Sequence, residues 1–148
     1  MTANNPFPLP ANLSPSLRRL LTYWESLKRG DNNMPFWDDV NPSALPELAG
    51  GLLLMDVFAD PERFRFNTVG GELAKRGGGA LSGKFADEVV LSDGLKFLRA
   101  QCSATIEARE PTFYRHGGGD NGGGFARLLA PMWGGGRIGM LLGAVETQ

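Results

Sequence analysis

Residues 112–145 read TFYRHGGGDNGGGFARLLAPMWGGGRIGMLLGAV and set the architecture of the chain. Three segments of strand length, 112–116, 125–132 and 137–145, are separated by two glycine-rich runs. Glycine readily adopts the backbone angles of tight turns, so both glycine-rich runs suit hairpin loops. The stretch therefore predicts three consecutive strands joined as antiparallel hairpins.

A second strand pair is predicted earlier in the chain. Residues 63–69 alternate in polarity, which places Phe64 and Phe66 on one face of a strand. Residues 52–58 form a short apolar run, and the Asp60-Pro61-Glu62 sequence between the two runs is typical of a turn. Two such runs around a tight turn indicate another antiparallel hairpin.

Two longer helices are predicted around these hairpins. Ser14-Pro15 is a helix-start signal, and Gly30 ends an amphipathic helix over residues 14–30. Its apolar face, with spacing of three and four, consists of Leu17, Leu20, Leu21, Trp24 and Leu27. A later helix is expected from Ser92 to Glu110, stopped by Pro111. Its apolar face consists of Leu95, Leu98, Cys102 and Ile106.

The order of elements predicts an α+β fold. Strands in two blocks joined by hairpins imply a five-stranded antiparallel sheet with helices on one face, and the helix over 14–30 is an addition to it. The length of 148 residues fits one domain, predicted over 14–148. Residues 1–13, rich in proline and asparagine, are predicted to be a flexible N-terminal arm.

Composition excludes several classes of function. Fifteen Lys and Arg residues balance sixteen Asp and Glu, which leaves no positive field for nucleic acid. No apolar run reaches the roughly 20 residues of a membrane span, so membrane insertion is not expected. Because the N-terminus lacks the pattern of a secretory signal, a cytoplasmic location is predicted. One cysteine and one histidine disfavour a disulfide and a Cys- or His-based metal site.

Several short motifs resemble a bacterial single-domain PAS-like family. The opening block comprises Leu20-Leu21-Thr22-Tyr23-Trp24, Met34-Pro35, residues 41–48 and Leu54-Met55-Asp56-Val57. Arg63-Phe64-Arg65-Phe66 with Val69-Gly70, Leu81-Ser82-Gly83 and the closing run 127–132 continue the match. The resemblance covers about residues 17–145. Trp37 stands where the family has a basic residue, and Asn41 stands where it has an acidic one.

The resemblance implies a sensory or signalling module that binds a small molecule or a signalling protein and has no catalytic output. In PAS folds an apolar space between the curved sheet and the long helix can hold a ligand. The candidate lining is Phe64, Phe66, Leu95, Leu98, Cys102, Phe113, Leu128 and Met132, with Tyr114, His116 and Arg127 as polar groups that orient the ligand. The competing interpretation is that these side chains simply fill the core.

In PAS proteins a flanking N-terminal helix often packs across the outer face of the sheet or against a second protomer, and a homodimer through this helix and the sheet is the leading expectation. Leu17, Leu20, Leu21 and Trp24 are the candidate interface residues. The reactive-cysteine motif of flavin photosensors is absent, and residues 92–110 contain no histidine to ligate haem. Covalently reacting flavin and haem are therefore disfavoured, and no cofactor is assigned.

Two other motifs suggest chemistry that the sequence does not support. Residues 78–84 fit the start of a phosphate-binding loop, but Phe85 replaces the Ser or Thr that would bind magnesium. Cys102 lies on an apolar helix face without an adjacent base, which favours a buried structural role. No catalytic or metal site is assigned. The alternatives to the signalling module are a protein-interaction scaffold with a filled core and a small α+β enzyme.

Overall fold

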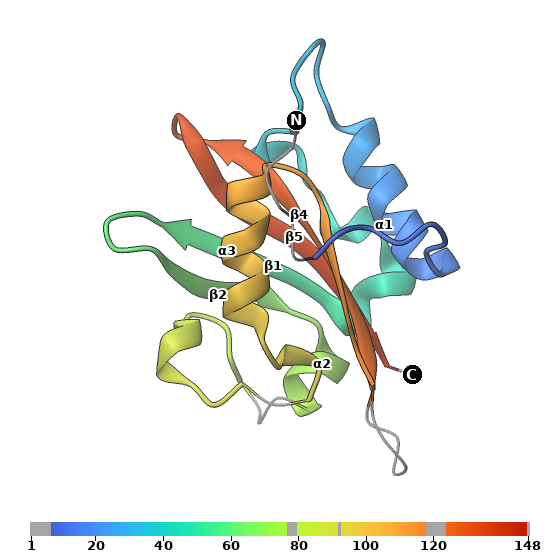
Figure 1. The fold of residues 1–148 in the computed structure, drawn as a ribbon, viewed down its shortest axis with the longest axis vertical. Helices are drawn as coiled ribbons and strands as arrows, with labels where there is room; N and C mark the ends of the chain where they lie inside the picture. Colours follow the sequence, from blue (N-terminus) through green and yellow to red (C-terminus); the bar gives the residue numbers. More distant parts are fainter. Residues whose placement is uncertain (1–6, 77–79, 92, 118–123, 148) are drawn as a thin grey trace.

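A computed structural model of the chain describes residues 7–76, 80–91, 93–117 and 124–147 (Figure 1). Its centre is a five-stranded antiparallel sheet in the order β2-β1-β5-β4-β3. The strands are β1 (Leu52–Phe58), β2 (Arg63–Val69), β3 (Thr112–His116), β4 (Phe125–Gly134) and β5 (Arg137–Thr147). The predicted α+β class and the predicted sheet are confirmed, and both are consistent with a PAS-like fold.

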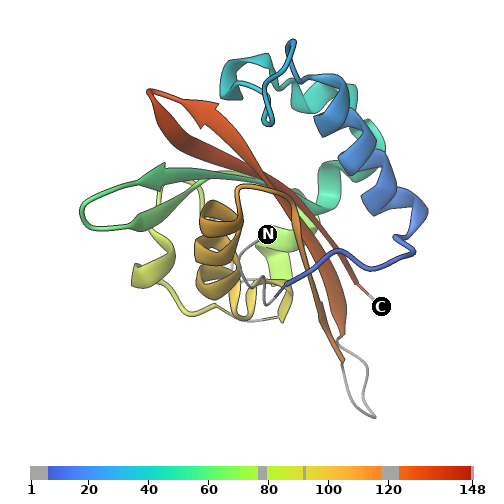
Figure 2. The same cartoon turned by 45° about the horizontal axis from the view of Figure 1, so that its top comes forward.

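Helices cover both faces of this sheet (Figure 2). One face carries α3 (Leu98–Ala108) and α2 (Gly71–Arg76), with the 3-10 turns η4 (Ala86–Glu88) and η5 (Asp93–Leu95). The other face carries α1 (Pro15–Ser26), with the turns η1 (Trp37–Asp39), η2 (Pro42–Ala44) and η3 (Pro46–Gly51). Within the described residues, no helix has the length and apolar character needed to cross a membrane.

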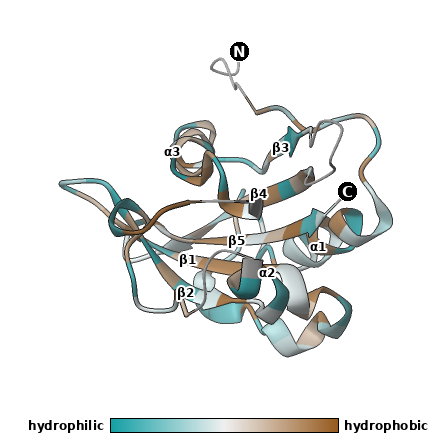
Figure 3. Ribbon diagram, turned by 90° about the horizontal axis from the view of Figure 1, so that it is seen from below, coloured by the Kyte–Doolittle hydropathy of each residue, from teal (hydrophilic) through white to brown (hydrophobic). Residues whose placement is uncertain are grey.

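Strand register divides the sheet side chains into an α3 face and an α1 face. Cross-strand partners project to the same side of a sheet. Arg127 pairs with Tyr114 on β3 and with Val145 on β5, and its side chain hydrogen-bonds to Gln101 of α3. Alternation from these positions assigns Met55, Phe64, Phe66, Leu129 and Leu141 to the α3 face. Figure 3 shows hydrophobic strand segments between the two helix layers.

The α1 helix packs on the opposite face of its own sheet. Its apolar stripe is covered there, because Leu17, Leu20 and Trp24 are 1%, 0% and 2% exposed. The Trp24 indole Nε1 donates a buried hydrogen bond of 2.9 Å to the carbonyl of Pro131 in β4. The chain has a helix here, but α1 ends at Ser26 and is shorter than the predicted range 14–30, and the predicted dimer interface is wrong for these three residues. The sheet of the same chain, and not a second protomer, buries them, and Leu21 remains half-buried.

The long helix is shorter than the sequence predicted. Residues 93–95 form η5, and α3 begins only at Leu98, after Phe97 adopts left-handed backbone angles of φ 60° and ψ 20°. The Arg127 guanidinium takes up the Gly94 and Lys96 carbonyls, which would otherwise accept bonds within a continuous helix. The expected cap at Ser92 lies outside the described residues.

The free edge of β4 is covered by the Met-Pro motif. Thr112, the first residue of β3, pairs with Leu129 of β4. The part of β4 that follows Leu129 therefore extends beyond β3 along this edge. There the Trp133 amide donates a 2.8 Å hydrogen bond to the Pro35 carbonyl. Gly134 is required beside it, because a Cβ at that position would collide with Cδ1 of Trp37. The segment around residues 34–37 thus extends the sheet at this end.

The N-terminal arm also contacts the sheet. The Phe113 amide of β3 donates a 3.0 Å hydrogen bond to the Phe7 carbonyl, and the Phe7 ring lies edge-on to Tyr114. Residues 1–6 of the predicted flexible arm lie outside the described residues, and its flexibility stays a prediction.

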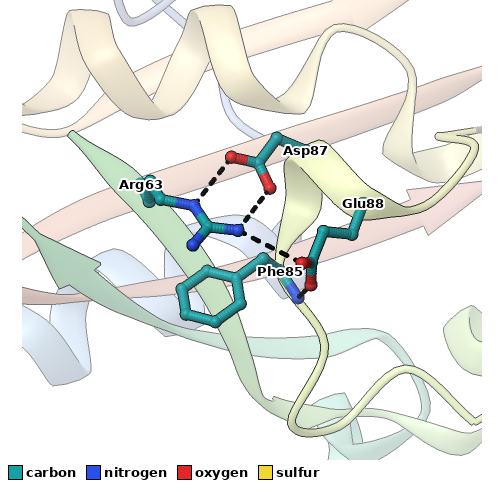
Figure 4. A network of polar contacts seen from close by, with 4 residues as sticks. All are labelled: Arg63, Phe85, Asp87 and Glu88. Atoms are coloured by element: carbon teal, nitrogen blue, oxygen red, sulfur yellow. Dashed lines mark hydrogen bonds and ion pairs between the residues drawn. The ribbon is translucent and has the colours of Figure 1, made fainter. Parts of the chain in front are cut away.

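An ion-pair network fastens η4 to β2 (Figure 4). Arg63 donates from Nε and Nη2 to the two carboxylate oxygens of Asp87, each at 2.9 Å, and Nη2 lies 3.4 Å from Glu88. The guanidinium also stacks 3.8 Å from the centroid of the Phe85 ring. The hydrogen bond from Arg63 lowers the pKa of Asp87 below its usual value of 3.8. The network therefore favours the ionised form of Asp87.

Asp87→Asn should reduce thermal stability at neutral pH and should lose this effect in acid. A lowered pKa in the folded state stabilises the fold above the unfolded-state pKa, and that gain disappears as pH falls through the folded-state value. The difference in melting temperature between wild type and variant is thus expected to shrink steadily below about pH 4. Asp31→Asn, at an exposed loop position, is the matched control. A difference independent of pH would contradict the assignment.

Candidate functional site

The interior between the sheet and α3 is filled by the predicted lining. Phe66, Leu95, Leu98 and Cys102 are each 0% exposed, and Phe64 is 4% exposed. All of them belong to one cluster of buried apolar side chains. The structure thus brings these predicted residues together as a packed core, in which the side chains themselves occupy the space that a ligand would need.

Three other predicted lining residues lie on the opposite face. Leu128 follows Arg127 directly, so its side chain projects toward α1. Phe113 pairs with Leu128, and Met132 shares the parity of Leu128 along β4. The assignment of Phe113, Leu128 and Met132 to the α3 side was therefore wrong. A one-residue difference in facing exchanges the two faces of a strand.

Tyr114 and His116 lie on the α3 face at the end of β3, inside a cluster of aromatic rings. The Tyr114 hydroxyl and His116 Nδ1 are 3.2 Å apart. His116 stacks on Phe125 at 5.4 Å between centroids, and Phe97 meets Tyr114 edge-on at 5.9 Å. Phe97 is 59% exposed, so this cluster reaches the surface. The predicted polar candidates are thus held by their neighbours at one corner of the sheet.

Arg127 is a buried polar side chain whose guanidinium donates three hydrogen bonds. It is 0% exposed, and it donates to Gln101 Oε1 at 2.7 Å, the Gly94 carbonyl at 2.8 Å and the Lys96 carbonyl at 2.9 Å. Its guanidinium also lies 5.2 Å from the centroid of Phe125. Within the described residues no carboxylate pairs with it.

These contacts give Arg127 a structural role. Burial lowers the pKa of Arg127 to about 10, and the group stays protonated at neutral pH. The carbonyl groups and the Gln101 amide oxygen supply the negative ends of dipoles that balance the cation. Arg127 thereby fixes the η5–α3 junction over the sheet. The sequence could not reveal these partners, because backbone carbonyls carry no residue signature.

Cys102 reports on whether this interior is closed. Burial raises the pKa of its thiol to about 12, and the side chain is fully buried. Native protein should therefore react with a thiol reagent such as DTNB at least about a thousandfold more slowly than the unfolded chain, because unfolded fractions are about 10⁻³ to 10⁻⁶. The absorbance of released thionitrobenzoate measures both rates. Comparable rates would show that the interior is open.

Two cavities lie at the end of the sheet where the α3 helix terminates. The first, of about 700 Å³, runs between the C-terminal turn of α1, the loop before η1 and the end of α3. We call it the Trp24 cavity; its aromatic lining residues are Trp24, Phe36 and Trp133. Lys28 lies 4.5 Å above the centroid of Trp24. A further cavity of about 390 Å³ lies elsewhere and is lined in part by Glu47, Glu72 and Glu146.

The second cavity at this end has a volume of about 480 Å³, and we call it the Ile138 cavity. It lies between the tips of the β1–β2 and β4–β5 hairpins and the end of α3. Its apolar lining is Val57, Phe58, Pro61, Ile106, Trp133 and Ile138. Its charged lining is Asp60, Glu62, Arg109 and Arg137. Trp133 and Arg109 line both cavities, so the two meet at this pair.

Local backbone geometry positions these charged groups. Arg109 ends α3 in a left-handed conformation with φ 57°, which glycine usually adopts at helix ends. Its guanidinium thereby lies over the Trp133 ring, 5.6 Å from the centroid. Arg137 donates from Nη1 to the Val57 carbonyl at 2.8 Å, which joins the two hairpins. Sequence reasoning did not select Trp133, because the segment 133–136 indicated only a hairpin loop, and an arginine at the end of a helix, such as Arg109, indicates only a solvated face.

Two residues of the glycine-rich motif, Gly83 and Lys84, form backbone hydrogen bonds to β2. The Gly83 amide donates to the Phe66 carbonyl at 2.7 Å, and the Phe66 amide donates to the Lys84 carbonyl at 2.9 Å. The Gly83 amide is therefore engaged, which agrees with a turn rather than a phosphate-binding loop. Residues 77–79 lie outside the described residues. Among the residues that the structure describes, no group of three or more His, Cys, Asp or Glu could hold a metal ion.

Searches against protein-family models, curated proteins and solved structures find no match to this chain.

Proposed function

We propose that this chain is a PAS-like signalling module that acts by binding, and that its ligand or partner is held outside a filled core. The binding region is the end of the sheet at which the Trp24 and Ile138 cavities meet. This proposal combines the signalling role expected from the PAS-like motifs with the filled-core interpretation of the interior.

The observation that carries the proposal is the packing between the sheet and α3. Leu95 and Leu98 are completely buried there, and Arg127 fixes the start of α3 to the sheet. None of the three cavities is lined by Phe64, Phe66, Leu95, Leu98 or Cys102. A ligand between the sheet and α3 would have to displace these packed side chains. The Trp24 and Ile138 cavities can accept a ligand without such a rearrangement, and we call the end of the sheet where they meet the open end.

The open end has the character of a binding region. Its cavities of about 700 and 480 Å³ fall in the range of about 300–1,000 Å³ that is usual for small-molecule sites. Aromatic and aliphatic side chains line them beside a small number of charged groups. Residues from α1, α3, the Met-Pro segment and both hairpins converge on Trp133, so a molecule bound there contacts elements far apart in the chain. Binding at such a point can shift the relative stability of those elements.

Several parts of the proposal rest on the PAS-like motifs alone. They are the bacterial signalling context, the absence of catalysis and the formation of a homodimer; the cytoplasmic location rests on the N-terminal sequence, which lacks the pattern of a secretory signal. A dimer would need a surface other than the apolar stripe of α1, since its own sheet covers that stripe. The alternative, a pure interaction scaffold that docks a protein through the sheet and the first helix, would share the filled core.

Xenon tests the filled core, because an empty apolar cavity takes up xenon. Met55 belongs to the α3 face and is 0% exposed, so its ε-methyl group reports on the interior. We expect the Met55 methyl resonance of ¹³C-methionine-labelled protein to stay in place under xenon pressure. Native mass spectrometry of the freshly purified protein should also show no mass beyond that of the polypeptide itself, whether one chain or two are in the particle. A xenon-dependent Met55 shift, or a retained small molecule that shifts Met55 on removal, would overturn the proposal.

A further inference from the structure

We propose that the Ile138 cavity is a site for a small ligand that joins a carboxylate to an apolar body. This inference deepens the proposed function, on which it rests, because it assigns one cavity of the open end to one ligand class. Three properties of the cavity support it: the chemistry of its floor, the charged groups on its rim and its volume.

The floor of the cavity is apolar and is built from the sheet and from α3. Ile138 of β5 is 6% exposed, and Val57 of β1 is also 6% exposed. Ile106 contributes from α3 on the side opposite the strands, and the half-buried Trp133 ring lies at the junction with the Trp24 cavity. An apolar group placed here would leave water on contact with aliphatic and aromatic carbon, which is the main source of favourable binding free energy.

Two guanidinium groups on the rim retain hydrogen-bond donors. Arg109 contacts the face of Trp133, and within the described residues it forms no ion pair. Arg137 uses Nη1 for the Val57 and Ile138 carbonyls, so its Nε and Nη2 groups are outside those bonds. Guanidinium groups bind carboxylates through two parallel N–H donors. The two arginines come from different elements and line the same cavity.

The cavity rim also carries two carboxylates, Glu62 and Asp60. Glu62 accepts a 2.6 Å hydrogen bond from the Ser103 hydroxyl, which holds it toward α3. Asp60 lies at the exposed tip of the β1–β2 hairpin, in a left-handed conformation with φ 55°. These two carboxylates balance the total charge of the rim, but Glu62 is already hydrogen-bonded to Ser103, whereas both guanidinium groups keep donors outside the bonds given above. This arrangement favours an anionic head group over a cationic one.

The size of the cavity limits the ligand to a small molecule. A volume of about 480 Å³ accommodates a ring or a short aliphatic chain with its head group.

Two of the three non-glycine residues with positive φ in the described part of the chain, Asp60 and Arg109, line this cavity. Such backbone angles cost energy and tend to occur at functional sites. The site thus combines an apolar floor, two arginines with donors outside the bonds given above and residues with left-handed backbone angles.

Phenylacetate is a suitable probe, and the chain provides a direct reporter. The sequence contains two isoleucines, Ile106 and Ile138, and both line this cavity. A ¹³C-isoleucine δ1-methyl spectrum therefore has two resonances, both of which should shift on titration with phenylacetate. The isosteric phenylacetamide and the cationic phenethylamine have the same ring without the anionic head group. We expect both to bind at least about tenfold more weakly than phenylacetate, because bonds to charged groups are the stronger ones.

Arginine variants separate the role of the head group from that of the floor. Arg109→Gln and Arg137→Gln should each weaken phenylacetate binding at least about fivefold and leave phenylacetamide binding unchanged. Arg115→Gln is the matched control, because Arg115 also lies over an aromatic ring, 5.8 Å from the centroid of Phe113, but lines neither cavity. It should leave both affinities unchanged. An unaltered Met55 resonance in each variant shows that the fold is intact.

The outcomes separate this inference from the proposed function. Equal affinity for phenylacetate and phenylacetamide, tighter binding of phenethylamine, or silent Ile106 and Ile138 resonances would each overturn the carboxylate site. The proposed function would survive those results if Met55 stayed unresponsive to xenon. A xenon-dependent shift of Met55 would instead overturn the proposed function, whatever the isoleucine methyl groups report.

Discussion

Replacing Arg127 by methionine is expected to lower the free energy of unfolding by about 3–5 kcal/mol, because this change removes the buried cation that holds three acceptors in place. Methionine has a similar length and no donors. The Gly94 and Lys96 carbonyls and the Gln101 amide oxygen would lose their partner, and buried unsatisfied groups cost about 1–3 kcal/mol each. The two carbonyls belong to the backbone, so no side-chain substitution at Gly94 or Lys96 could remove these unsatisfied acceptors.

The effect should be localised at the start of α3. Hydrogen exchange in the segment 94–101 is expected to speed up more than exchange in the β1–β2 hairpin, because Arg127 fixes the η5–α3 junction. Guanidinium denaturation measures the overall loss. Arg137→Met is a matched control in β5, since Arg137 is exposed and should lose far less stability. A loss under about 1 kcal/mol for Arg127→Met would contradict the structural role assigned to this arginine.

Replacing Trp24 by alanine is expected to lower the free energy of unfolding by about 3–5 kcal/mol. Trp24 is 2% exposed and fills the space between α1 and the sheet. Its indole also supplies the hydrogen bond to the Pro131 carbonyl on the β4 edge. Trp24→Phe keeps most of the packing but removes the donor, and should cost about 1–3 kcal/mol. Chemical denaturation followed by circular dichroism measures both losses.

Trp37→Ala serves as the control for Trp24, since Trp37 is 49% exposed and should lose much less stability. The sequence-based alternative makes a different prediction for Trp24. If α1 were a dimer interface, Trp24→Glu would convert a dimer into a folded monomer. The burial of Trp24 predicts loss of folding instead. A folded, monomeric Trp24→Glu variant in sedimentation experiments would contradict the packing of α1 on its own sheet.

Elements with strong local signals were predictable from the sequence. The alternation around Phe64 and Phe66 defines β2, and the serine and proline at residues 14 and 15 define the start of α1. In β4 and β5 the apolar runs are bounded by glycines, and the strands extend only a few residues beyond the predicted limits. In each case the information lies within a few neighbouring residues, which is why the sequence suffices.

Features set by distant contacts were not predictable. The apolar stripe of α1 indicates that the helix is covered, but it does not say by what. The residues from Ser92 to Phe97 favour a helix locally, yet Arg127, some 30 residues away in the chain, draws the carbonyls of Gly94 and Lys96 out of a continuous helix. Strand facing was predicted correctly for Tyr114 and wrongly for Phe113, because burial on both faces of the sheet removes the alternating pattern.

In the candidate site, too, features set by local sequence were predictable and features set by distant contacts were not. The buried lining residues were predictable, because apolar side chains on facing elements form a core. Whether they enclose space or fill it depends on how the side chains pack against one another, which no motif encodes. Arg109 and Trp133 gave no signal in the sequence, since their meeting depends on the left-handed end of α3 and on the β4–β5 hairpin. Only the structure brings these residues together.

The most decisive measurement is a methyl NMR screen of the isoleucine- and methionine-labelled chain against a library of small molecules. Ile106 and Ile138 report on the Ile138 cavity, Met34 reports on the Trp24 cavity, and Met55 reports on the interior. Binding outside a filled core predicts that the molecules that bind shift Ile106, Ile138 or Met34 and leave Met55 in place. Molecules that shift Met55 while the other three stay unchanged would place the binding site between the sheet and α3 and would contradict the proposal.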